Sequence, residues 1–120
     1  MDLKKDHHVP AGALILYKQL LALFPEIELK GKTVLYTSLN GNMFTFLSAE
    51  GILAIRLSAE EREVFLKKHN TKLMEAHGTV LKEYVRVPGP LLTKTEELKR
   101  FFELSFRYAK SLKPKSSAKK

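Results

Sequence analysis

Histidines are the first residues to consider for chemistry in this chain of 120 residues, and their spacing suits metal binding poorly. His7 and His8 are adjacent, so they lack the i, i+4 spacing that would place two ligands on one helix face. His69 and His77 stand eight residues apart, without another histidine or a carboxylate at ligand spacing. We therefore expect no metal site, and we expect His69 to lie at the C-terminus of a helix.

Carboxylates offer one further catalytic possibility. Glu60, Glu61 and Glu63 cluster, but a helix N-terminus attracts acidic residues without any catalytic role. Glu83 and Tyr84 could together serve a small enzyme, and this is an alternative that the sequence leaves open. The Gly-rich phosphate loops, the G-x-S-x-G elbow and H-E-x-x-H are absent. We therefore expect a protein that is not an enzyme and that holds no cofactor.

The composition narrows the class of protein further. No cysteine is present, which excludes disulfides, thiolate nucleophiles, Cys-type zinc sites and iron–sulfur clusters. The chain is 44% hydrophobic and 28% charged, with no apolar run near the roughly 20 residues of a membrane span. Its length suits one domain with one core. We expect a soluble, globular, cytoplasmic protein that does not bind membranes.

The net charge of +8 comes mostly from one end of the chain. Between Val9 and Ala109 there are 14 basic and 11 acidic residues, a net charge of only +3. We expect a flexible N-terminus at 1–9, a single domain at 10–112 and a disordered tail at 113–120. A nucleic-acid-binding module is an alternative function, because lysines can contact phosphates. The candidate lysines are Lys110, Lys113, Lys115, Lys119 and Lys120.

Helical periodicity and capping residues predict three helices. Residues 13–24 carry apolar residues at 3, 4, 3 spacing, and Pro25 follows them. Ser58 and Glu61 have the S-x-x-E form of a capping box, so a helix is expected from Ala59. Thr95 is expected to supply the capping hydroxyl of a third, long helix.

Residues 33–57 are rich in β-branched and aromatic residues and predict a three-stranded meander. Asn40-Gly41 and Glu50-Gly51 are taken as its two-residue turns. Residues 80–87 predict a further strand after a connection at 72–78, with Leu81 and Glu83 on one face. The fold class is therefore α+β, with an antiparallel sheet of this meander plus one or two further strands packed with about three helices.

The two turns fix which residues share a face of the meander. The core face is expected to hold Leu35, Leu39, Phe44, Phe46, Leu53, Ile55 and Leu57. The opposite face is too apolar for full solvation, so we expect it to carry an interaction surface. Its candidate residues, with those of the 80–87 strand, are Tyr36, Met43, Leu47, Ile52, Arg56, Lys82, Glu83, Tyr84 and Arg86.

Several segments in one order resemble the TfoX N-terminal-domain family. They are the hairpin strands 42–47 and 52–57, the capped helix start 58–65, the K-E-Y-V strand 82–88 and the Y-x-x-S-L-K-P terminus 105–115. The resemblance implies a secretion-chaperone-like α+β domain, often paired as a dimer. Regulators of the TfoX/Sxy type act in bacterial competence as transcriptional co-activators. We therefore expect a regulatory protein-interaction module, homodimeric and with a regulatory protein as its partner.

Overall fold

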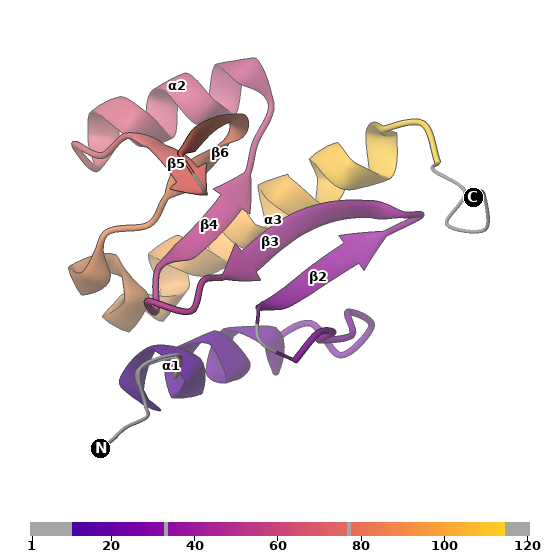
Figure 1. Ribbon diagram of the computed structural model, residues 1–120. Coiled ribbons are helices and arrows are strands. Elements are labelled where there is room, and N and C mark those ends of the chain that lie inside the picture. The colour runs from indigo at the N-terminus through magenta and orange to yellow at the C-terminus, as the bar shows by residue number, and fades with distance from the viewer. Residues whose placement is uncertain (1–10, 33, 77, 115–120) are drawn as a thin grey trace.

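The computed structural model describes residues 11–32, 34–76 and 78–114. The predicted α+β class is confirmed, since three α-helices pack on a five-stranded antiparallel sheet (Figure 1). The elements are, in chain order, α1 (Ala11–Leu21), β2 (Leu35–Leu39), β3 (Asn42–Leu47), β4 (Leu53–Arg56), α2 (Ala59–Lys68), β5 (Leu73–Ala76), β6 (Thr79–Arg86), the 3-10 helix η1 (Gly89–Thr93) and α3 (Thr95–Ser111). No helix among these residues is long and apolar enough to cross a bilayer.

The helices begin and end close to where the local sequence predicts. Ser58 caps α2, and its side chain accepts a hydrogen bond from the Glu61 backbone N–H. Asn70 follows the helix with a positive φ of 48°, a conformation that asparagine tolerates better than most residues. The capping role expected of Thr95 is wrong, because α3 already includes this residue and Lys94 holds the cap position without a side-chain bond.

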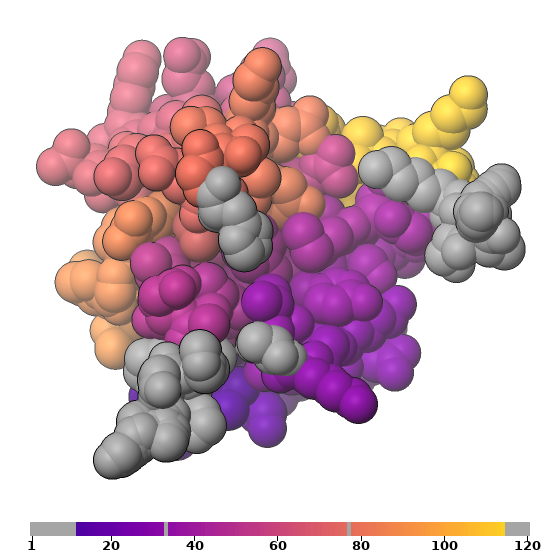
Figure 2. Space-filling model, in the orientation of Figure 1, coloured from indigo at the N-terminus to yellow at the C-terminus, as the bar shows by residue number. Residues whose placement is uncertain are grey.

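The sheet has the order β2-β3-β4-β6-β5, and every neighbouring pair is antiparallel. Figure 1 shows α3 behind β3 and β4, α1 below the sheet and α2 above it. The main core lies between the sheet and the helices and includes Tyr17, Phe44, Phe65 and Phe102. We call the other side of the sheet the open face, because none of the three α-helices packs on it. The open face points toward the viewer in Figures 1 and 2.

The predicted register of the meander is right at its first turn and wrong beyond it. Leu39 pairs with Asn42 as expected, but a β-bulge then pairs Thr37 with Thr45 in place of Phe44. Phe44 and Thr45 therefore both face the helices, where Thr45 Oγ1 lies 2.8 Å from the hydroxyl of Tyr17. An inserted residue of this kind reverses the facing of every later residue on the strand.

The second turn contains three residues, not two. The Ser48 N–H donates to the Ile52 carbonyl, and Leu47 pairs with Leu53. Gly51 adopts a positive φ of 86°, as the last residue of such a loop commonly does. This extra turn residue offsets the bulge, so β4 presents the predicted face to the core although β3 does not.

The strand β5 lies in the segment expected to be a connection. It pairs with β6 through an irregular register, with Leu73 opposite Val85 and Met74 opposite Leu81. The prediction that Leu81 shares a face with Glu83 is also wrong, since Leu81 packs with Met74 on the open face. The sheet thus gains an edge strand that brings apolar side chains to the open face.

Candidate functional site

The open face carries a second apolar cluster, separate from the main core. Phe46, Ala54 and Met74 are buried at its centre. Partly buried side chains surround them, namely Tyr36, Met43, Ile52, Leu81 and Tyr84. The rings of Phe46 and Tyr84 pack in a tilted arrangement, with centroids 5.6 Å apart and an interplanar angle of 58°. The structure thus brings together four of the predicted interaction residues, Tyr36, Met43, Ile52 and Tyr84.

Leu47 does not belong to this surface, so its assignment there was wrong. Its side chain is fully buried in the main core. The bulge at Phe44 and Thr45 exchanges the facing of Phe46 and Leu47, which puts Phe46 on the open face instead. Phe46 was missed because a sequence shows alternation along a strand but does not show where a bulge interrupts it.

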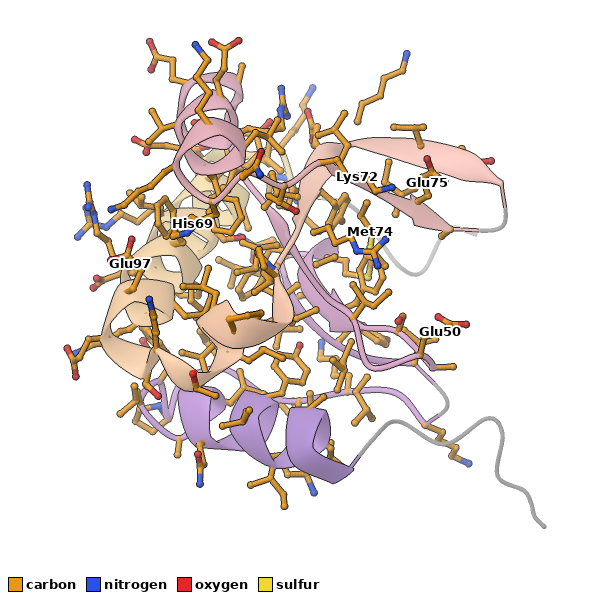
Figure 3. All side chains as sticks on the ribbon, turned by 90° about the vertical axis from the view of Figure 1, so that its left-hand side faces the viewer. Glu50, His69, Lys72, Met74, Glu75 and Glu97 are labelled. Atoms are coloured by element: carbon orange, nitrogen blue, oxygen red, sulfur yellow. The ribbon has the colours of Figure 1, made fainter. Side chains whose placement is uncertain are left out.

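A groove of about 280 Å³ runs along one end of the open face. Phe46 and Met74 line it together with Val34, the β3–β4 turn and the end of β5. Glu50 and Glu75 are its charged residues, and both side chains are exposed. Figure 3 shows Glu50, Met74 and Glu75 on the same side of the molecule. The groove therefore combines an apolar lining with an acidic rim.

A network of polar side chains links Tyr84 on the open face to Tyr108 of α3. Arg56 Nη2 lies 2.6 Å from Glu83 Oε1, and the Arg56 Nε–H donates to the same oxygen. The hydroxyl of Tyr108 donates to Glu83 Oε2 at 3.0 Å, and the hydroxyl of Tyr84 donates to the Met43 carbonyl at 2.8 Å. Arg56 Cζ lies 5.8 Å from the ring centroids of both tyrosines. These bonds tie β3, β4, β6 and α3 together.

The protonation of this network follows from its contacts. Burial alone would raise the pKa of Glu83, but hydrogen bonds from Arg56 and Tyr108 outweigh it and hold that pKa below its usual value. Burial raises the pKa of Tyr84. Burial and the hydrogen bond to Glu83 raise the pKa of Tyr108. Glu83 is thus an ionised, fully engaged carboxylate, and neither it nor Tyr84 lines a described pocket that could hold a substrate.

The remaining basic residues of the predicted surface lie apart from this network. Lys82 is exposed, and Arg86 is half-buried beside Ala54 on the adjacent strand. The Arg86 backbone bonds to Lys72 and Thr71, which holds the start of β5 against β6. The structure records no bond from the side chains of Lys82 or Arg86 to the network around Glu83.

A larger groove of about 470 Å³ lies on the opposite side of the molecule, where Figure 3 shows His69 and Glu97. His69 ends α2 as expected, and its ring packs 4.7 Å from that of Phe65. Its Nε2 atom lies 3.4 Å from Glu97 Oε2, and Lys68 Nζ approaches the same oxygen at 2.7 Å. The hydrogen bond from Lys68 lowers the pKa of Glu97. The ion pair of Lys68 and Glu97 links the end of α2 to the first turn of α3.

Several residues that the sequence analysis singled out lie outside the part of the chain that the structure describes. His7, His8, His77, Lys115, Lys119 and Lys120 lie outside the described residues. Lys110 and Lys113 of the lysine group are described, and the Lys113 carbonyl accepts a hydrogen bond from the Asn42 side chain. Within residues 11–32, 34–76 and 78–114, no three acidic or histidine side chains gather as metal ligands would.

Comparisons of the chain with protein-family models, with curated proteins and with solved structures find no match. The resemblance to the TfoX N-terminal-domain family thus stays a prediction from the sequence. The open face, with its apolar cluster and its groove, is the candidate site that the fold itself provides.

Proposed function

We propose that this protein is a non-enzymatic interaction module that binds other proteins through its open face. The observation that carries this proposal is the second apolar cluster on a sheet face without a helix. A sheet normally buries an apolar face against another layer, and a contiguous apolar surface at the exterior marks an interaction site. Phe46 and Met74 at the centre of the cluster are already buried in the absence of a partner, so a partner would meet a preformed surface.

Homodimerisation is one use of this face, and a regulatory protein of the bacterial cytoplasm is the other partner that we propose. The resemblance to TfoX-type co-activators supports both, because that likeness implies pairing and a role in transcription regulation. Two copies meeting through Tyr36, Met43 and Ile52 would cover apolar surface that each copy leaves partly exposed.

Sedimentation at micromolar concentration tests self-association. Ile52→Glu places a charge on the open face and should shift a dimer to monomer, because an unpaired charge in an apolar interface is costly. Val64→Glu is the matched control, since Val64 is an exposed apolar residue on α2, at 52% exposure. A wild-type protein that is monomeric throughout would remove the dimer from the proposal.

We propose nucleic-acid binding through the lysine-rich end as a second function. The bond between Asn42 and Lys113 fixes the start of this end beside the β2–β3 turn. The groove lies at the other end of β3, so the two functions can be tested apart. Comparing the DNA affinity of the full chain with that of a chain ending at Leu112 decides it, because the lysines should carry the salt-dependent affinity.

A further inference from the structure

We propose that the groove on the open face binds an extended peptide of a partner protein in which large apolar residues alternate with lysine or arginine. This inference rests on the proposed function and specifies the partner. In the bound state one apolar side chain lies against Phe46 and Met74 in the groove. The neighbouring basic side chains lie beside Glu50 and Glu75.

Charge complementarity favours a basic partner. Glu50 and Glu75 are the charged residues that line the groove, and no lysine, arginine or histidine lines it among the described residues. The chain as a whole carries a net charge of +8, so this acidic rim is opposite in sign to the net charge of the chain. Both carboxylates are exposed and neither has an ion-pair partner recorded in the described part of the chain. Because both side chains are exposed, they can pair with cations from a ligand.

The shape of the groove favours one apolar anchor. Its volume of about 280 Å³ is at the lower end for ligand pockets and suits a side chain with the adjoining backbone. Phe46 is 6% exposed and Met74 is 3% exposed, so the packing around them holds both lining side chains in place. Methionine adapts to side chains of different shape, which suits an anchor that can be leucine, isoleucine or phenylalanine.

The edge strand β5 favours an extended ligand. Met74, Glu75 and Ala76 of this strand line the groove, and β5 is the last strand of the sheet. On its outer side no described strand pairs with it, so its backbone can accept a peptide by β-strand addition. Alternate side chains of an added strand point to opposite faces, so apolar residues can face the groove while basic residues face the rim.

Three synthetic peptides of about seven residues, the length of an ordinary strand, test this inference by fluorescence anisotropy. One alternates lysine with leucine, one glutamate with leucine, and one lysine with serine. We expect the lysine–leucine peptide to bind, and each of the others to bind at least about tenfold more weakly. Equal binding of the glutamate–leucine peptide, or no binding of the lysine–leucine peptide, would overturn the inference.

Reversing charges on the protein tests whether the peptide binds at the groove. The double variant Glu50→Lys, Glu75→Lys should weaken binding of the lysine–leucine peptide about tenfold at low salt, because two attractions between exposed charges become repulsions. The double variant Glu63→Lys, Glu103→Lys changes the net charge equally at exposed positions on the two helices α2 and α3. It should leave the affinity within about twofold. Equal weakening by both double variants would mean non-specific attraction and would overturn the inference.

Methyl NMR with labelled methionine separates this inference from the proposed function. Met74 lines the groove, whereas Met43 packs at the other end of the open face. We expect the lysine–leucine peptide to shift the Met74 signal and to leave the Met43 signal in place. A shift of Met43 alone would overturn the groove as the peptide site while still supporting an interaction at the open face. The dimer is tested independently by sedimentation of Ile52→Glu.

Discussion

Truncation of Leu47 to alanine discriminates between the two registers that β3 could adopt. Regular alternation from the first turn places Leu47 on the open face beside Ile52, whereas the bulge places it in the main core. The structure therefore predicts that Leu47→Ala is far more destabilising than Ile52→Ala. A register without the bulge predicts similar effects for both.

The expected magnitude follows from burial. Leu47 is fully buried, and truncating a fully buried leucine costs about 2–5 kcal/mol, because apolar burial is lost and a cavity remains. Ile52 is only partly buried at the rim of the second cluster, so Ile52→Ala should cost about 1 kcal/mol. A domain of this size has a total stability of about 5–15 kcal/mol, so Leu47→Ala removes a large part of it.

Urea unfolding followed by circular dichroism measures both variants, since the chain contains no tryptophan for fluorescence. Comparing midpoints at an unchanged slope gives the difference in free energy of unfolding. Peptide binding provides a second measurement, because Leu47 does not line the groove and Leu47→Ala should keep its affinity while folded. A cost below about 1 kcal/mol for Leu47→Ala, equal to that of Ile52→Ala, would refute the bulged register.

Three further substitutions test individual contacts. Glu83→Gln should lower stability at neutral pH, and this loss should shrink as the pH falls below the usual carboxyl pKa of 4.5. The reason is that the lowered pKa of folded Glu83 stabilises the protein only while the carboxylate is ionised. A difference in melting temperature that does not change with pH would contradict this. Ser58→Ala should cost about 1 kcal/mol in thermal unfolding through loss of the α2 cap, and no loss would show that the cap contributes nothing. Tyr17→Phe should also cost about 1 kcal/mol by removing the buried bond to Thr45, and an unchanged melting temperature would mean that the bond between Thr45 and Thr37 is sufficient without it.

Local features of the fold were predictable because their causes are local. Ser58 begins α2 through a bond to a residue three positions along the chain, and Asn40-Gly41 forms the first hairpin turn. Both depend on backbone conformations that few residue types adopt, so composition at one or two positions determines them. The third, long helix was predictable for a similar reason, because apolar residues on one face of a helix recur at a regular spacing.

The candidate site was only partly predictable, since it depends on pairings between distant segments. Tyr36, Met43, Ile52 and Tyr84 were placed on the correct face. Phe46 and Leu47 were exchanged because the bulge in β3 has no marker in the sequence. Met74 was missed altogether, since the short strand β5 exists only by pairing with β6.

The sequence by itself determined what this protein lacks and where its net charge resides. Absence of cysteine, scattered histidines and a lysine-rich end are properties of residue types and positions, so no folding is needed to establish them. The tertiary structure decided which apolar side chains form the core and which meet a partner. That choice depends on strand register and on which face of the sheet the helices cover, and both are set by long-range packing that minimises exposed apolar area over the whole chain.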